Sequence, residues 1–474
     1  MVLLIVDVFF SFTIPRTSML QTQQVYKIPL LLAVIAVAVG IGFFVNLQVT
    51  QPLVVVTAVL IFIVLFLHGD YILFGLLFSM LLSPEIVVGE TARRDFTVRF
   101  EDFIILVMAF AWVSKIAILK DPGIFQHAPI NRRVHLYIAA CVLSTTFGMS
   151  IGDVDVAAGM AFVIKYIEFY IVYIVVLNNI KDRHSLQYYV YTMCLVCCII
   201  CLVGVGQYIQ GLGVEAPFEG GGSIERNTLG GYLIFLFGLT MGLLFYEKRR
   251  GLRIFLFCLA VLIIVTLVIS LSRSSWIAFG VICIYFLAVV RQYRKHLFVF
   301  MITLAIIIPL TAPEMTKERV YQTFKPTETR EKVVTVFDFR LDPSMSARII
   351  SFQRALDEFY KHPLLGWGIT GFYFIDSQYF RSIAEIGALG LLAFLAMLFG
   401  IGKAARMVRA RLSGFEHGVV LGFSGGFVGL LVHSLAANTF IIVRIMEPFW
   451  FLTAIVMYLY IQEFHPQEKA TEKK

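Results

Sequence analysis

Residues 227–246, NTLGGYLIFLFGLTMGLLFY, contain no charged side chain and are followed by the basic residues Lys248, Arg249 and Arg250. A helix of about 20 apolar residues crosses the hydrocarbon core of a lipid bilayer. Further apolar runs lie at 28–48, 51–68, 70–84, 101–119, 134–150, 158–178, 187–209, 252–271, 275–291, 296–312, 384–402, 418–437 and 441–461. With 59% hydrophobic and 15% charged residues, the sequence predicts an all-α integral membrane protein with about 12–14 transmembrane helices.

Alternate short loops are basic, and this pattern sets the expected orientation of the helices. The basic loops contain Lys120, Arg132 and Arg133; Lys181 and Arg183; Lys248, Arg249, Arg250 and Arg253; Arg291, Arg294 and Lys295; and Lys403, Arg406, Arg409 and Arg411. Loops rich in Lys and Arg stay in the cytoplasm. The loops between them are acidic or neutral, with the exception of 85–100. Both termini are therefore expected in the cytoplasm.

One long polar segment interrupts the apolar runs and divides the chain into three parts. Residues 1–312 form the N-terminal part of the expected transmembrane bundle, 313–383 an outer loop, and 384–474 the C-terminal helices and a cytoplasmic tail. Within the loop, 346–361 is expected to form an amphipathic helix, because apolar residues recur at spacings of three and four. These apolar residues are Ile349, Phe352, Leu356 and Phe359. We expect this stripe to lie against the bundle.

Several function classes have no support in the sequence. It contains no Walker loop, no dinucleotide fingerprint and no cluster of metal-ligand residues, so we expect no cofactor. The net charge of +8 is concentrated in the basic loops, which indicates contact with anionic membrane lipid rather than with nucleic acid. The seven cysteines lie in or beside apolar runs and are expected to be small buried hydrophobic residues.

Five ionisable side chains map to the outer ends of the predicted helices or to the outer loop. They are Arg226, Arg273, Arg348, His433 and Arg444. Ionisable groups are energetically expensive in a membrane and indicate a functional site by default. Arginine binds phosphate through two parallel hydrogen bonds and stays charged. The alternatives are that Arg226 and Arg273 are interfacial anchors and that His433 is a packed, hydrogen-bonded residue.

A second group of candidates follows the outer loop. Residues 366–374 are rich in glycine and aromatic residues, which suits stacking on sugar rings. The side chains of Asp376, Tyr379, Arg381 and Glu385 follow at spacings that place several of them on one helix face. A carboxylate such as that of Asp376 can accept a proton from a hydroxyl nucleophile. Aspartate is equally common as an N-cap.

At these residues the second half of the chain resembles the O-antigen ligase and polymerase superfamily of bacterial envelope glycosyltransferases. The resemblance rests on the order of five short motifs. These are Arg226, Asn227, Leu229 and Gly230; Ser272 and Arg273; Arg348; Glu385, Gly387 and Gly390; and His433 and Asn438.

The resemblance implies a GT-C-type bundle with one large periplasmic loop in the bacterial inner membrane. Such an enzyme takes a glycan from undecaprenyl diphosphate at the periplasmic face without nucleotide or metal. Arg273 and Arg348 would hold the diphosphate and stabilise it as the leaving group. Further substrate contacts are expected from Arg226, Tyr379, Arg381, Glu385, Asn438 and Arg444.

The resemblance also distinguishes two branches of the superfamily. In the ligases a catalytic histidine stands eleven residues before the first glycine of the Glu385 motif, and this chain has Asp376 there. We therefore expect a polymerase of O-antigen or exopolysaccharide, with Asp376 as the base and His433 as the second candidate. Its expected partners are lipid-linked oligosaccharide, membrane lipid and other polysaccharide-assembly proteins such as a chain-length regulator.

Two alternatives remain open. One is a ligase that transfers the glycan to lipid A core or another acceptor. The other is a transporter or flippase for a polyanionic lipid or solute. A transporter is expected to place its charges near the middle of the membrane, whereas here they gather at the outer rim.

Overall fold

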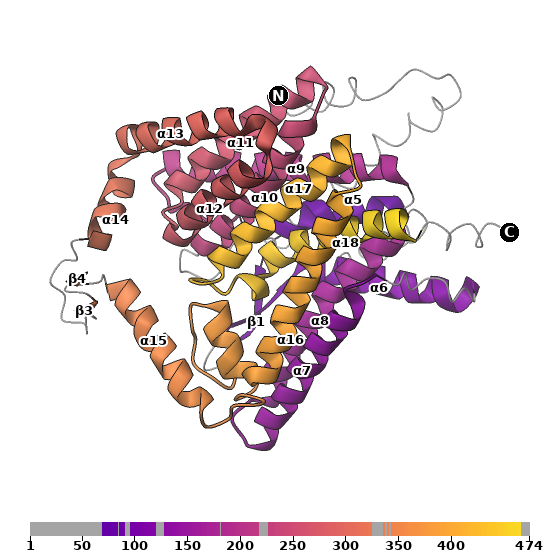
Figure 1. Cartoon of the computed structure of the whole chain (residues 1–474). Helices are drawn as coiled ribbons and strands as arrows, with labels where there is room; N and C mark the ends of the chain where they lie inside the picture. Colours follow the sequence, from indigo (N-terminus) through magenta and orange to yellow (C-terminus); the bar gives the residue numbers. More distant parts are fainter. Residues whose placement is uncertain are drawn as a thin grey trace, which may run out of the picture. The chain divides into compact units, whose positions relative to one another are not determined.

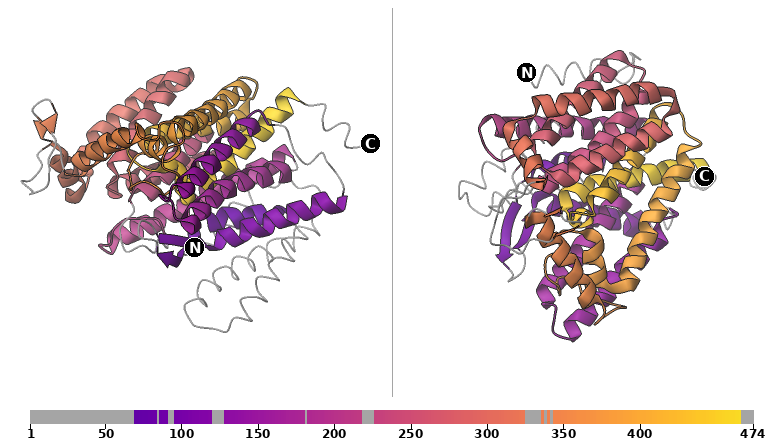
Figure 2. Two further views of the ribbon diagram at one scale, coloured as in Figure 1. Left: turned by 90° about the horizontal axis from the view of Figure 1, so that it is seen from below. Right: turned by 60° about the vertical axis from the view of Figure 1, so that its left-hand side comes forward.

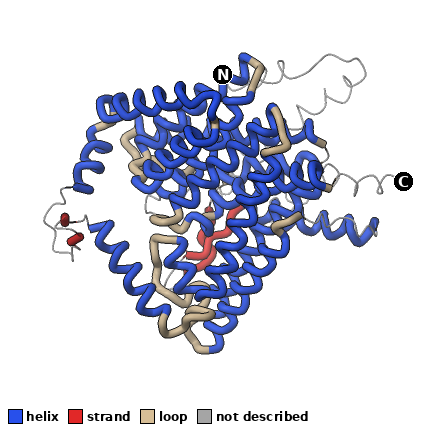
Figure 3. The backbone as a smooth tube through the Cα atoms, in the orientation of Figure 1, coloured by secondary structure: helices blue, strands red, loops and turns tan. Residues whose placement is uncertain are grey.

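The computed structural model describes residues 69–83, 85–90, 95–119, 128–180, 182–217, 226–324, 335–336, 339–340 and 343–465. Almost all of these residues belong to one unit, Ile72–Lys474. Helices dominate the described part of the chain (Figures 1 and 3). The apolar runs expected at 28–48 and 51–68 lie outside the described residues.

Each apolar run expected from residue 70 onward coincides with a helix. These are α5 (Gly69–Leu82), α6 (Phe100–Leu119), α7 (Asn131–Ser150), α8 (Val156–Asn179), α9 (Arg183–Ile209), α10 (Arg226–Tyr246), α11 (Arg250–Ile269), α12 (Arg273–Val289), α13 (Arg294–Thr311), α16 (Gln378–Arg409), α17 (Gly414–His433) and α18 (Val443–Phe464). Among the described residues, eight helices are long and apolar enough to cross a membrane. The prediction of an all-α integral membrane protein is confirmed.

Short elements complete the described part. The strands β1 (Glu85–Glu90) and β2 (Asp95–Arg99) form an antiparallel hairpin in the expected outer loop 85–100, with an irregularity between Val87 and Gly89. The long polar segment contains α14 (Glu314–Phe324), the paired strands β3 (Thr335–Val336) and β4 (Phe339–Arg340), and α15 (Pro343–Phe359). Two 3-10 turns, η3 (Arg291–Tyr293) and η4 (Thr439–Ile441), precede α13 and α18.

Helices α10 and α17 pack backbone against backbone through glycines. A Cβ atom added to Gly422 would lie 2.7 Å from the Cα atom of Leu239, and one added to Gly426 would lie 2.6 Å from the carbonyl oxygen of Phe235. From the other helix, Cβ atoms on Gly238 and Gly242 would collide with the backbone of α17. Small residues spaced four apart let membrane helices approach this closely. We call this contact the glycine seam.

Helix α16 is broken at Gly387, whose φ of 63° is the left-handed conformation that favours glycine. The preceding loop supplies backbone partners at the break. Its amides donate to the carbonyl groups of the first half-helix, and its carbonyl groups accept from the amides of the second. The four bonds are Trp367 N to Ala384 O (3.0 Å), Gly368 N to Glu385 O (2.8 Å), Ala388 N to Pro363 O (2.9 Å) and Leu389 N to Leu364 O (3.2 Å). The loop and α16 can be followed in Figures 1 and 2.

The amphipathic helix predicted at 346–361 is present as α15, but its packed face differs from the prediction. Ala355 is fully buried, and the ring of Phe352 stacks on that of Phe380 with centroids 4.2 Å apart. Leu356, expected in the stripe, is 40% exposed. The prediction counted only large apolar residues, and it therefore overlooked a small alanine that lets α15 approach α16.

The glycine seam should be sensitive to a single added methyl group. Replacing Gly422 with alanine pushes a Cβ atom into the backbone of α10, which cannot move aside, so we expect a loss of about 1–3 kcal/mol of stability. Gly280 on α12 has no atom within 4 Å of an added Cβ, and Gly280→Ala is the matched control. The thermal midpoint of the detergent-solubilised protein measures both. Equal midpoints for the two variants would contradict the role of the seam.

Candidate functional site

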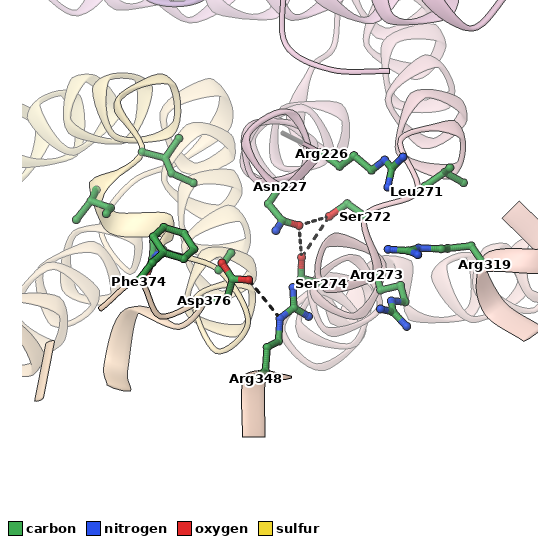
Figure 4. Close-up of a pocket in the computed structure, with 14 residues that line it drawn as sticks. Arg226, Asn227, Leu271, Ser272, Arg273, Ser274, Arg319, Arg348, Phe374 and Asp376 are labelled. Carbon is green, nitrogen blue, oxygen red and sulfur yellow. Dashed lines mark hydrogen bonds and ion pairs between the residues drawn. The ribbon is translucent and has the colours of Figure 1, made fainter. Parts of the chain in front are cut away.

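A cavity of about 350 Å³ lies where several helix ends meet. Its walls come from the start of α10, the turn between α11 and α12, the helices α14 and α15, and the loops that precede α16 and α18 (Figure 4). The charged and amide side chains on the cavity are Arg226, Asn227, Arg273, Arg319, Arg348, Asp376 and Asn438.

Four of these side chains are arginines, and Asp376 is the only acidic residue that lines the cavity among the described residues. Arg226 and Arg273 are the first residues of α10 and α12, so the N-terminal ends of two helices face the same space. Guanidinium groups stay charged, and helix N-termini carry a partial positive charge. The cavity therefore favours an anion with more than one negative charge.

Two motifs that the sequence shows separately are joined in the structure. The hydroxyl groups of Ser272 and Ser274 both donate to the side-chain oxygen of Asn227, each at 3.0 Å. Gly230, one turn along α10, makes room for Ser275, because a Cβ atom there would collide with the serine hydroxyl. The N-termini of α10 and α12 are thus held together. As a result, Arg226 and Arg273 face one cavity.

The turn that carries Arg273 is conformationally unusual. Leu271 has a φ of 59°, the left-handed conformation that non-glycine residues rarely adopt. It follows the end of α11, where glycine is common, and it lines the cavity. This conformation reverses the chain, so that Ser272 and Arg273 begin α12 at the cavity wall.

Asp376 lies opposite the arginines and pairs with Arg348. The distance from Arg348 Nε to Asp376 Oδ2 is 3.8 Å, which is longer than a hydrogen bond, and the Asp376 side chain is 40% exposed. Partial burial raises the pKa of Asp376, and the charge of Arg348 opposes this rise. The N-cap position of α16 is occupied by Ser377 and not by Asp376. The alternative that Asp376 is the N-cap of this helix is therefore wrong.

The two residues of the late motif have different surroundings. His433 is fully buried, does not line the cavity, and its Nδ1 atom lies 2.8 Å from the hydroxyl of Thr439. Its other ring nitrogen, Nε2, is buried and has no hydrogen-bond partner among the described residues. Asn438 lines the cavity. The backbone amide of Gln378, the first residue of α16, donates to the carbonyl groups of Ser434 and Ala437 and fixes this loop beside Asp376.

Four expected substrate-binding residues do not line the cavity. The hydroxyl of Tyr379 donates to the carbonyl oxygen of Leu431 at 3.0 Å. Arg444 is buried and donates to the carbonyl groups of Leu81 and Pro217. Arg381 and Glu385, which are also absent from the cavity wall, form a buried ion pair of 2.8 Å. The structure therefore gives these four side chains protein partners away from the cavity wall.

The pair of Arg381 and Glu385 braces the broken helix. The second carboxylate oxygen of Glu385 accepts from the backbone amide of Thr370 at 3.3 Å. The hydroxyl of Ser144 on α7 donates to the carbonyl oxygen of Glu385 at 2.7 Å. Their common helix face therefore points toward α7 and the loop before α16. The sequence predicted a shared helix face for these residues, and in the structure that face supports the protein internally.

Sequence reasoning missed Arg319, which is on the cavity wall from α14. Its helix is anchored by Thr316, whose hydroxyl donates to the carbonyl oxygen of Val268 at the end of α11 (3.3 Å). Arg319 lies in the long polar segment, where basic and acidic residues are nearly balanced. No feature of the sequence distinguishes it from the solvated arginines nearby.

Residues 258–395 match the family model described as O-antigen ligase. This segment is therefore similar to the O-antigen ligase and polymerase superfamily. The match confirms the resemblance found in the sequence and covers Arg273, Arg319, Arg348 and Asp376, whereas Arg226 lies before it. A search of curated proteins finds no match. Together, the match and the eight apolar helices indicate a multi-pass membrane protein with a function of the O-antigen ligase or polymerase type.

The ion pair of Arg381 and Glu385 should be needed for stability. Replacing Glu385 with alanine leaves a buried guanidinium group without its carboxylate, so we expect the free energy of unfolding to fall by about 3–5 kcal/mol. The double variant Arg381→Met/Glu385→Ala should recover part of this loss. Glu358→Ala is the control, because Glu358 pairs with Lys361 at the surface, where such pairs contribute little. Thermal midpoints in detergent test this, and an unchanged midpoint for Glu385→Ala would show that the pair is not structural.

Proposed function

We propose that the protein is a glycan polymerase of the bacterial inner membrane. It transfers an undecaprenyl-diphosphate-linked oligosaccharide onto a second lipid-linked repeat unit at the periplasmic face, in the synthesis of O-antigen or an exopolysaccharide. The observation that carries this proposal is the single cavity lined by four arginines and by Asp376. The family match supports a glycosyltransferase-like enzyme that acts on lipid-linked oligosaccharide.

The reaction requires two kinds of group, and the cavity contains both. A hydroxyl oxygen of the acceptor sugar attacks the anomeric carbon of the donor, and the bond from this carbon to the phosphate oxygen breaks. The electron pair of that bond stays on the diphosphate. Guanidinium groups fixed around the leaving group stabilise this developing charge more in the transition state than in the ground state. We assign this role to Arg226, Arg273 and Arg319, which line the cavity.

Asp376 is the proposed base. Its carboxylate takes the proton of the attacking hydroxyl, which increases the charge on the nucleophilic oxygen as the bond to the anomeric carbon forms. Arg348 lies between the aspartate and the other arginines in Figure 4, and it pairs with Asp376 at 3.8 Å. The guanidinium group of Arg348 therefore lies next to both the proposed base and the proposed diphosphate site.

A ligase is the second candidate, and it is favoured by the description of the matched family as O-antigen ligase. The carboxylate at residue 376 favours the polymerase, because the resemblance places a histidine there in ligases. A flippase is less well supported by the charge pattern. The mid-helix Lys165 is neutralised by Glu168 at 2.9 Å and by Asp102 at 2.6 Å, whereas the cationic cavity lies at helix ends.

Purified protein in liposomes, given only lipid-linked repeat units, should build a ladder of longer lipid-linked glycans without any lipid A core. Asp376→Asn should reduce elongation by about a hundredfold or more, since general-base catalysis contributes on this order. Asp357→Asn, an exposed aspartate on α15, is the matched control and should elongate like the wild type. A product that forms only after core acceptor is added would replace the polymerase with the ligase.

The rate of elongation should fall at low pH, because Asp376 acts as a base only when it is ionised. Burial raises the pKa of Asp376 and Arg348 lowers it, so Arg348→Gln should move the acid limb of the pH–rate profile to higher pH. Arg348→Lys keeps the charge and should move it less. The profile of kcat/KM for the three proteins tests this. Identical acid limbs would exclude Asp376 as the titrating base.

A further inference from the structure

The cavity has a second wall, formed by Phe374 and Asp376, whose purpose the arginines on the other side do not explain. In Figure 4, Phe374 and Asp376 lie together on one side of the cavity, and Arg226, Arg273 and Arg319 lie on the other. Asn438 also lines the cavity. A diphosphate would occupy the arginine side. The group attached to that diphosphate must then extend toward the phenyl ring and the carboxylate.

In the loop before α16, the side chain of Phe374 is exposed on the cavity, whereas those of its neighbours Phe372 and Ile375 are buried. Phe372 and Ile375 are buried, and they pack in one apolar cluster with Ala355 and Ala384. Phe374 is 61% exposed on the cavity. Tyr373 is 71% exposed but does not line the cavity. The anchored backbone thus presents one aromatic face to whatever occupies this half of the cavity.

Asn438 provides an independent indication of a ligand. Its side chain is 6% exposed, and neither its amide nitrogen nor its amide oxygen has a hydrogen-bond partner among the described residues. A buried amide without partners is unfavourable. A sugar hydroxyl can satisfy both atoms, because a hydroxyl group donates and accepts. The carbonyl of the preceding Ala437 accepts from Gln378, which places Asn438 close to the Asp376 segment.

We propose that Phe374 and Asn438 form a subsite that holds a pyranose ring of the glycan next to Asp376. The C–H face of the ring would cover the phenyl ring and remove apolar surface from water. The amide would hold a ring hydroxyl. This inference rests on the proposed function, and it assigns the sugar and the diphosphate to opposite walls of the cavity.

Binding to two probes separates the two walls. The probes are undecaprenyl diphosphate, which carries no sugar, and lipid-linked repeat units extracted from the source cells. Both are titrated into the full-length protein in nanodiscs. Phe374→Ala and Asn438→Ala should each weaken binding of the repeat unit by about three- to tenfold and leave undecaprenyl diphosphate unaffected. Arg319→Ala should weaken binding of both probes, and Tyr373→Ala of neither.

The outcomes distinguish this inference from the proposed function. If wild-type protein binds neither probe, the proposed function fails and the subsite with it. If it binds both with equal affinity, or if the variants bind the repeat unit like wild type, the subsite is absent while the function stands. Equal losses for both probes would mean that Phe374 and Asn438 contact lipid or phosphate. Phe374 is exposed, so Phe374→Ala is expected to fold and tests the subsite even if Asn438→Ala does not.

Discussion

The site depends on the direct backbone contact between α10 and α17. Gly238 and Gly242 face Gly422 and Gly426 without intervening side chains, and this close contact sets the depth of the two helices relative to each other. That depth brings the start of α10, with Arg226 and Asn227, level with the end of α17. The loop after α17 then carries Asn438 to the cavity. A longer side chain in the seam would separate these two walls.

The break in α16 positions the wall of the cavity that carries Phe374 and Asp376. A continuous helix would leave no unpaired backbone groups for the 363–368 loop, whereas the break at Gly387 offers carbonyl groups on one side and amides on the other. Unpaired backbone groups are costly in a membrane. The loop is therefore held at the break, where it forms hydrogen bonds with these groups. The loop leads directly into the segment with Phe374 and Asp376. A glycine in the motif therefore determines where the proposed base lies, although it is far from the chemistry.

The sequence predicted most of the helices and only part of the site, for physical reasons. Long apolar runs have few alternatives in a protein of this composition, so each run within the described residues became a helix. Arg226 and Arg273 were recognisable because a charge at a membrane boundary is unusual, and Arg348 because it is one of the motifs that carry the resemblance. Arg444 carried the same signal, yet it satisfies backbone carbonyl groups of Leu81 and Pro217. Sequence shows that such a charge must be compensated, but it does not show whether protein or ligand compensates it.

The four arginines of the cavity act together electrostatically, although one of them, Arg319, could not be recognised from the sequence. Four guanidinium groups and one carboxylate face a common space, and like charges at short range repel each other more strongly where water is scarce. A cavity of this kind is most stable when an anion fills it, so stability and anion binding are coupled through the same groups. Arg319 contributes to this coupling from an external helix, α14, rather than from the bundle. Its position is a property of how α14 docks on the end of α11, which no local pattern in the sequence encodes.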